Sequence, residues 1–226
     1  MFSPDRKTIL AAGYTLGSTE TFAPLWEAET GREILRIPNP AIVLTASFSP
    51  DGKYVLMGNW NDGSSYLWDA RKGTKLREFT GGFATFSPDG KFVVTVRGPT
   101  GFIWDAQTGK EIRRFDGPAD GFGFVVYSPD SRTIASLTFD GSVRLWDAQT
   151  GRELRRYPHA ASVNNVAFSP DGKYIVSVSA DGVARFFDVD YHKTINYLCS
   201  ILLRDFTDEE RVQYNITDHE PTCPAQ

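Results

Sequence analysis

The chain has 226 residues, of which 41% are hydrophobic and 23% charged, proportions typical of a globular protein with a substantial core. Its formal net charge of -4 argues against binding that rests on attraction to nucleic-acid phosphates or anionic membranes. No apolar run reaches the ~18 residues needed to span a bilayer, and the first residues lack the features of a signal peptide, so we expect a cytoplasmic protein.

Two short marks recur along residues 2–190. The first is FSPD, which begins at Phe2, Phe48, Phe86 and Phe168, and as YSPD at Tyr127. The second is a Trp-Asp pair or a close relative, found at 26–27, 68–69, 104–105, 146–147 and 187–188. Successive marks lie 36 to 46 residues apart. Such a period indicates a repeat architecture in which each unit buries its faces against its neighbours.

Residues 163–189 show the elements of one unit in chain order. Residues 163–168 predict a strand, and the SPDG turn that follows suits a proline-containing type I turn. Residues 173–179 predict a second strand, which Asp181-Gly182 joins to a third by a tight hairpin. In the earlier units a Gly-containing turn leads to a fourth strand, as in 75–79, 111–115 and 153–157. Four short antiparallel strands per period predict a propeller blade.

These marks resemble the WD-repeat β-propeller family, and more specifically its bacterial members with a helical C-terminal tail. The resemblance implies an all-β fold of about five four-stranded blades over residues 1–191, with the first and last incomplete, followed by a tail over 192–226. It also implies a buried polar network in each blade, which is complete nowhere in this sequence. The positions that match it are His159, Ser177 and Asp181, then Ser136, Asp140 and Trp146, and the tryptophans Trp26, Trp68 and Trp104.

The two ends of the repeat array are incomplete. Met1 falls one residue before the first FSPD mark, so most of an inner strand is missing there, and the last unit lacks the Gly-containing turn before its fourth strand. We expect either a longer protein with further blades upstream of Met1, or an open propeller whose unpaired strand edges favour self-association or a partner chain.

The tail changes character after residue 191. Apolar residues spaced by three and four over 192–206 predict a helix, although 192–198 also suit a strand. We expect the tail helices to cap the last blade or to form a dimer contact. Thr207 and Glu210 fit a capping box at the start of a second short helix. Two histidines and two cysteines in the tail, His192, Cys199, His219 and Cys223, do not have the spacing of a zinc site.

The resemblance implies a binding platform rather than an enzyme, and the sequence contains no motif for a cofactor, metal or nucleophile. We expect a protein or peptide partner on the face that carries the hairpins between second and third strands. The residues expected to contact it are Trp60, Asn61, Arg97, Phe122, Phe139 and Asn164. Alternatives are the regulatory part of a larger bacterial signalling kinase or NTPase and, less favoured, a hydrolase-associated propeller.

Arginines recur on the predicted fourth strands, at 36, 77, 113, 114, 155 and 156. They suit either a basic rim for nucleic acid or charges that discourage edge-to-edge pairing of outer strands. Neighbouring glutamates at 78, 111 and 153 favour the second interpretation.

Overall fold

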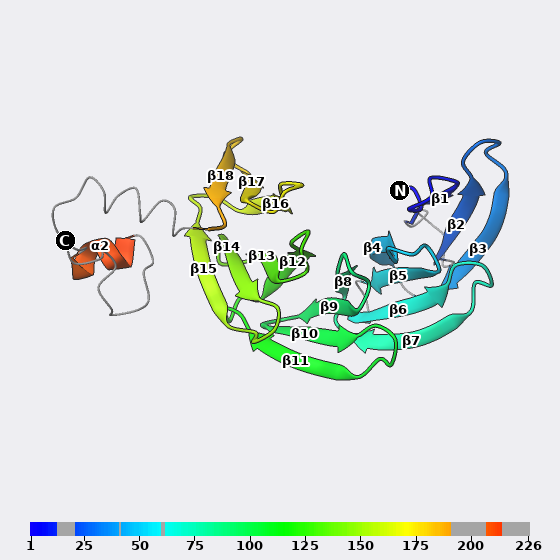
Figure 1. Cartoon of the computed structure of the whole chain (residues 1–226), viewed down its shortest axis with the longest axis horizontal. Helices are drawn as coiled ribbons and strands as arrows, with labels where there is room; N and C mark the ends of the chain where they lie inside the picture. Colours follow the sequence, from blue (N-terminus) through cyan, green and yellow to red (C-terminus); the bar gives the residue numbers. More distant parts are fainter. Residues whose placement is uncertain (13–20, 41, 60–61, 191–206, 214–226) are drawn as a thin grey trace.

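The computed structural model describes residues 1–12, 21–40, 42–59, 62–190 and 207–213, and the account below concerns these residues. They form five antiparallel sheets that follow one another along an arc (Figure 1). Within each sheet, strands adjacent in the sequence are adjacent in space. The sheets are propeller blades, which confirms the fold expected from the repeat.

The blades are numbered here in chain order. Blade 1 has β1 (Thr8–Leu10), β2 (Thr21–Glu27) and β3 (Glu33–Asn39), and blade 2 has β4 (Val43–Phe48), β5 (Tyr54–Asn59), β6 (Ser64–Asp69) and β7 (Lys75–Thr80). Blade 3 has β8 (Phe83–Phe86), β9 (Phe92–Arg97), β10 (Thr100–Asp105) and β11 (Glu111–Asp116). Blade 4 has β12 (Phe122–Tyr127), β13 (Thr133–Thr138), β14 (Ser142–Asp147) and β15 (Glu153–Pro158), and blade 5 has β16 (Val163–Phe168), β17 (Tyr174–Ser179) and β18 (Ala184–Asp188).

The SPD turns owe their shape to side-chain bonds that satisfy turn amides. In blade 4 the Ser128 hydroxyl donates to the Asp130 carboxylate at 2.6 Å and accepts the Thr133 amide at 2.9 Å. The same carboxylate accepts the Arg132 amide at 3.0 Å. The arrangement recurs in the turns that begin at Ser3, Ser49, Ser87 and Ser169. Short polar side chains that bond nearby backbone groups favour turns, which explains the regular position of this motif.

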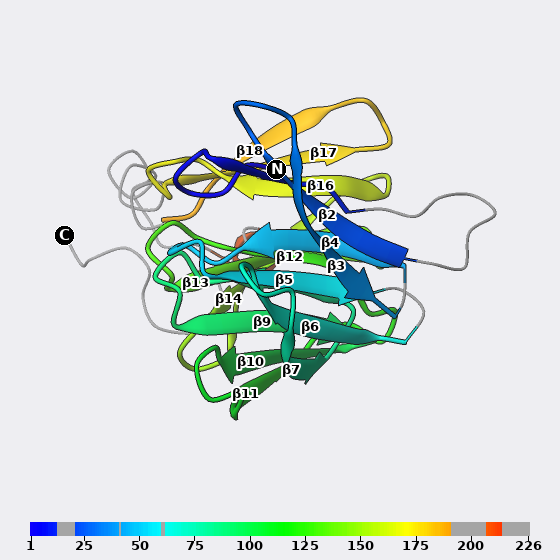
Figure 2. The same ribbon diagram turned by 90° about the vertical axis from the view of Figure 1, so that its right-hand side faces the viewer.

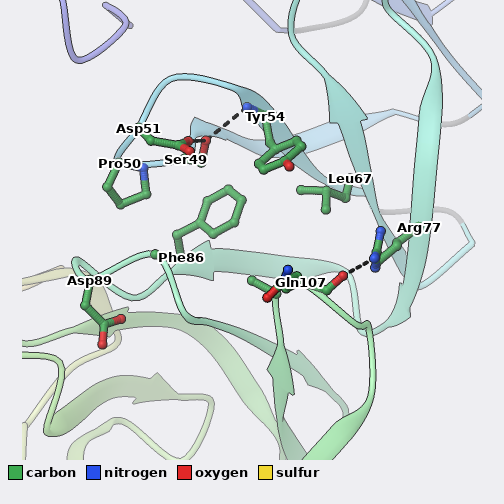
Figure 3. Close-up of a pocket in the computed structure, with 11 residues that line it drawn as sticks. Ser49, Pro50, Asp51, Tyr54, Leu67, Arg77, Phe86, Asp89 and Gln107 are labelled. Atoms are coloured by element: carbon green, nitrogen blue, oxygen red, sulfur yellow. Dashed lines mark hydrogen bonds between the residues drawn. The ribbon is translucent and has the colours of Figure 1, made fainter.

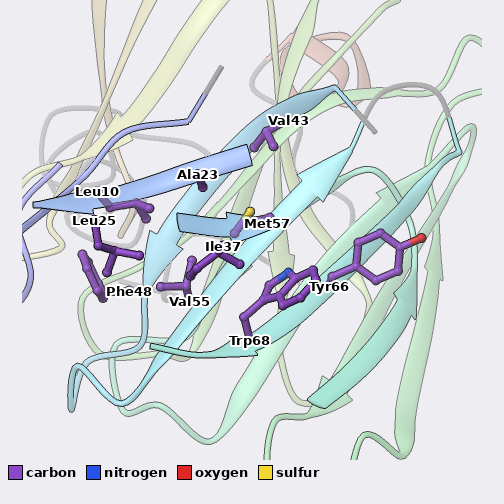
Figure 4. Close-up of a cluster of buried hydrophobic side chains, with 10 residues drawn as sticks. All are labelled: Leu10, Ala23, Leu25, Ile37, Val43, Phe48, Val55, Met57, Tyr66 and Trp68. Carbon is purple, nitrogen blue, oxygen red and sulfur yellow. The ribbon is translucent and has the colours of Figure 1, made fainter. Parts of the chain in front are cut away.

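Apolar side chains fill the spaces between consecutive blades. Because side chains alternate along a strand, Val55 and Met57 of β5 pack toward blade 1, whereas Leu56 packs toward blade 3. Figure 4 shows the cluster between blades 1 and 2, which includes Leu25 of β2 and Trp68 of β6. Each inner blade therefore needs apolar residues on both faces, which explains the nearly continuous hydrophobic runs in its middle strands.

The arc is open, and its two ends are the incomplete blades (Figure 1). In blade 1 only residues 1–3 lie along the inner edge of β1, where Phe2 bridges to Ile9 and the Leu10 amide donates to the Met1 carbonyl at 2.8 Å. Figure 2 brings blades 1 and 2 to the front and shows their strands running side by side. In blade 5 the described strands end at β18. The expected gap at the inner edge of blade 1 is thus present, whereas the fourth strand of blade 5 would fall after residue 190, outside the described residues.

In the tail, the structure describes the short helix α2 (Asp208–Gln213). The Thr207 amide donates to the Glu210 carboxylate at 2.9 Å, and the Glu210 amide donates to the Thr207 hydroxyl at 3.3 Å. This reciprocal pair confirms the expected capping box. The helix or strand expected within 192–206 lies outside the described residues.

Candidate functional site

The topology separates two kinds of loop. Since consecutive strands are antiparallel, hairpins between second and third strands lie at one end of each blade, together with the entries to the inner strands. We call this end the hairpin face. The SPD turns and the turns after the Trp-Asp marks lie at the opposite end, which we call the turn face.

Phe139, one of the predicted contact residues, is exposed, with 64% of its surface accessible. It lies directly after β13, and its amide donates to the Gly121 carbonyl at 3.0 Å. This bond ties the hairpin to the loop that enters β12, so the ring is presented from a fixed backbone. A fixed, exposed aromatic ring is a common anchor in protein interfaces.

Two other predicted residues are also exposed on this face. Arg97 ends β9 and lies beside Gly63 of the neighbouring hairpin, and Asn164 lies at the start of β16. The predicted residues Trp60 and Asn61 lie outside the described residues. The structure therefore places Arg97, Phe139 and Asn164 where a partner can reach them.

Phe122 is not a surface residue, and its expected role as a contact was wrong. Only 3% of it is exposed, because its ring packs edge-on against Phe115 (5.5 Å between centroids) and Trp146 (5.7 Å). Val43 and Val163 occupy the same position in blades 2 and 5 and are also buried. An apolar residue at this position in several repeats is the sequence signal that would have identified a core role.

His159 is held by two hydrogen bonds. One ring nitrogen, Nδ1, lies 3.0 Å from the Tyr157 carbonyl, and the other, Nε2, lies 2.7 Å from the Ser177 hydroxyl. Because a carbonyl oxygen only accepts, Nδ1 carries the proton and Nε2 accepts from the serine. Burial lowers the pKa of His159, so the neutral ring fits this position.

Trp146 and Trp104 each donate to the side chain at the second-strand position that Ser177 occupies in blade 5. The Trp146 indole donates to the Ser136 hydroxyl at 2.9 Å, and the Trp104 indole donates to Thr95 at 2.8 Å. Phe187 replaces the tryptophan in blade 5, which leaves Ser177 to His159. Trp26, in incomplete blade 1, is only half-buried.

The hairpin aspartates Asp140 and Asp181 bond to arginines instead of joining a network with a histidine. Arg144 is buried and donates to Asp140 at 2.5 Å and to Glu153 at 2.6 Å. Hydrogen bonds from Thr138, Ser142 and Arg144 outweigh the effect of burial and hold the pKa of Asp140 far below its ordinary value. Asp181 and Arg185 repeat this pair in blade 5 at 2.6 Å. The network implied by the family resemblance is thus split into an indole–hydroxyl part and an aspartate–arginine part.

Three arginines of the outer strands form ion pairs with neighbouring glutamates. These pairs are Arg36 with Glu33 (2.8 Å), Arg114 with Glu111 (2.6 Å) and Arg156 with Glu153 (3.5 Å). The pairing offsets the positive charge along the outer edge, which supports the interpretation of these residues as edge charges.

In the described part of the chain, grooves open on the turn face between blades 1 and 2, between blades 2 and 3, and between blades 3 and 4. The first, about 390 Å³, lies between blades 1 and 2, and the second, about 540 Å³, lies between blades 2 and 3. Figure 3 shows the second, where the Phe86 ring lies below Pro50 and Tyr54, and Arg77 donates to the Gln107 carbonyl. The third, about 630 Å³, lies between blades 3 and 4 and is lined by Phe92, Ile103, Ile112, Arg113, Tyr127, Ser131, Arg132, Asp147, Ala148 and Gln149.

Within the described ranges, no group of histidine, cysteine, aspartate and glutamate side chains could hold a metal ion. The tail histidines and cysteines lie outside those ranges. No helix in the described part is long and apolar enough to cross a membrane.

Comparison with protein-family models identifies the family to which this repeat architecture belongs. The model described as WD domain, G-beta repeat matches residues 33–69, 109–147 and 151–188, which together make up half of the chain. Each match begins at or two residues before the outer strand of one blade (β3, β11 and β15) and ends at the Trp-Asp or Phe-Asp mark of the next. No curated protein matches the sequence. The chain belongs to the WD40-repeat family and is a protein-interaction type of domain.

Proposed function

We propose that the chain is a non-catalytic scaffold that binds a protein or peptide on its hairpin face. The observation that carries the proposal is Phe139, an aromatic side chain that is 64% exposed on a hairpin fixed by a backbone bond to Gly121. Burying such a ring against a partner removes a large apolar surface from water without ordering a flexible loop.

The surroundings of Phe139 suit a protein contact. Arg97 and Asn164 provide exposed hydrogen-bonding groups on the same face. Arginine and aromatic residues dominate the binding energy of many interfaces, whereas flanking polar groups set orientation. A binding rather than catalytic role also agrees with His159, whose two ring nitrogens are both engaged within the blade.

The test compares proteins captured by the wild-type chain and by Phe139→Ala from extracts of the source cells. Since Phe139 is mostly exposed, the variant should keep the thermal stability of the wild type to within about 0.5 kcal/mol. We expect at least one partner to be retained by the wild type and lost by the variant. Leu154→Ala, which removes an exposed apolar side chain from an outer strand, is the matched control and should retain it.

Identical capture by Phe139→Ala and the wild type would contradict a partner site at this hairpin. Loss of the same partner in Leu154→Ala would also contradict it, because the effect would not be confined to the hairpin face.

A further inference from the structure

The three grooves of the turn face are repeats of one another, so each serves as a reference for the others. Equivalent elements line all of them: the third strand and outer strand of one blade, and the inner-strand aromatic residue and both turns of the next. Blade packing alone accounts for whatever the grooves share. Features found only in the third groove need another explanation.

Tyr127 is the first such feature. The equivalent residues Phe2, Phe48, Phe86 and Phe168 have no hydroxyl, so packing at this position does not need one. Tyr127 is 5% exposed, and its hydroxyl is buried with no hydrogen-bond partner in the described part of the chain. Burial also raises the pKa of this phenol. A buried, unpaired hydroxyl destabilises the fold unless something supplies an acceptor.

Ser131 is the second feature. The same turn position is glycine in blades 2, 3 and 5, where φ lies between 70° and 72°, a region that other residues enter at a cost. Ser131 adopts φ 63°, and its hydroxyl accepts the Asp89 amide of blade 3 at 3.2 Å. Arg6 adopts a similar φ of 59° at the same turn position of blade 1 but does not line the first groove, so what is particular to the third groove is the serine side chain. Here the serine adds a polar group to the wall of the groove.

The third feature is a pair of arginines. The lysines equivalent to Arg132 form ion pairs within their own turns, Lys53 with Asp51 at 2.9 Å and Lys91 with Asp89 at 3.8 Å. Among the described residues, no carboxylate lies within ion-pair distance of Arg132 or Arg113. In the second groove the residue equivalent to Arg113 is Arg77, whose guanidinium donates to Gln107.

The charges lining the three grooves differ accordingly. The second groove has Asp51 and Asp89 against Arg77, and the first has equal numbers of each sign. The third has Arg113 and Arg132 against Asp147, whose carboxylate already accepts the Thr150 hydroxyl and two backbone amides. The third groove is therefore the positive one, with an apolar wall formed by residues such as Phe92, Ile103 and Ile112.

We propose that the third groove binds an acidic peptide segment from a partner protein, with a carboxylate at Arg113 and Arg132 and an adjacent apolar side chain on the Phe92–Ile103 wall. A peptide oxygen beside Tyr127 gives its hydroxyl the missing acceptor. The volume lies within the range of 300 to 1,000 Å³ usual for ligand sites. This site is on the turn face and does not depend on the proposed role of Phe139.

The probe is a short fluorescein-labelled peptide of alternating leucine and glutamate, titrated with the full chain and followed by fluorescence anisotropy. We expect saturable binding that weakens with added salt, since charge-assisted bonds contribute to it. Arg113→Ala with Arg132→Ala should weaken binding at least about tenfold. Tyr127→Phe should weaken it at least about threefold while leaving the thermal midpoint unchanged or higher, because it removes an unpaired buried group.

Two controls make the result specific. The peptide with glutamine in place of glutamate should bind at least about tenfold more weakly to the wild type. Arg77→Ala, the equivalent change in the second groove, and Phe139→Ala should both bind the acidic peptide like the wild type. No binding to the wild type, or equal binding by the Arg113/Arg132 variant, would overturn the proposal and leave the proposed hairpin site untouched.

Discussion

The indole of Trp146 donates a hydrogen bond to the hydroxyl of Ser136, both of them buried between the blades. In blade 2 the equivalent residues are Trp68 and Met57, and a thioether side chain takes the place of the hydroxyl. The Trp68 indole nitrogen is buried and has no partner in the described residues. The indole N–H at this position therefore has a hydrogen-bond acceptor in blade 4, whereas in blade 2 it has none among the described residues.

This contrast predicts that a Trp→Phe substitution destabilises the fold more in blade 4 than in blade 2. Trp146→Phe removes a hydrogen bond and leaves the Ser136 hydroxyl buried and unpaired, whereas Trp68→Phe removes an indole nitrogen that is already unpaired. Both remove a similar apolar area. We expect Trp146→Phe to lower the free energy of unfolding by ~1–3 kcal/mol more than Trp68→Phe, measured by urea denaturation. Equal losses would show that the Trp146–Ser136 bond contributes no net stability.

The ion pair inside blade 4 predicts a second difference. Asp140→Asn leaves the guanidinium of Arg144, a buried residue, with only Glu153 as a charged partner, and should destabilise the fold by roughly 2–4 kcal/mol. Asp181→Asn is the matched control and should cost less, because the Arg185 side chain is 29% exposed.

At acidic pH, the Asp140→Asn substitution should lower the free energy of unfolding by less than it does at neutral pH. The folded-state pKa of Asp140 lies below its ordinary value, so its contribution is complete above about pH 4 and is lost as the pH falls below that. The stability difference between wild type and Asp140→Asn, measured by urea denaturation at decreasing pH, should shrink below that pH. A constant difference would contradict the assignment.

The repeat was readable from the sequence because each mark has a local physical cause. The SPD residues bond their own turn amides, and the hairpin glycines adopt positive φ, so both signals survive without knowledge of distant contacts. Strand positions in all five blades follow directly. The role of Phe122 was less visible, because a register shift between Phe122 and Phe124 turns the ring toward Trp146.

The polar contacts depended on distances that no single sequence reveals. Asp181 was expected in a network with His159, and Asp140 in one with Ser136 and Trp146. Each aspartate instead pairs with the arginine four residues further along the chain. Tyr127 was visible only as a variant of the FSPD mark. Its importance comes from the burial of the hydroxyl and from two arginines that the fold brings to the same groove from blades 3 and 4.

His159 predicts a dependence of stability on pH. Burial lowers its folded-state pKa, so the folded chain binds the proton less readily than the unfolded chain. The contribution of His159 to the free energy of unfolding is therefore fully present above the unfolded-state pKa of about 6.5. It is lost as the pH falls below that value. His159→Gln should remove this part of the pH dependence between about pH 7 and 5 in urea titrations. An unchanged slope in the variant would assign the effect to other groups.

The free face of blade 5 predicts self-association. Phe186 is 71% exposed and Val178 is 42% exposed, whereas the equivalent residues of blade 4, Leu145 and Leu137, are covered by blade 5. A row of apolar side chains on an uncovered sheet is a surface on which proteins associate. Phe186→Lys should therefore lower the weight-average mass at high concentration in a sedimentation series.

The substitution leaves the buried face of blade 5 intact, so the thermal midpoint should stay within a few degrees of the wild type. Leu76→Lys is the control, because it places the same charge at an exposed apolar position on the outer strand β7 of blade 2. If charge alone kept the molecules apart, both variants would reduce association equally. Only a reduction specific to Phe186→Lys assigns the contact to the free face, and a wild type that stays monomeric at every concentration contradicts the prediction.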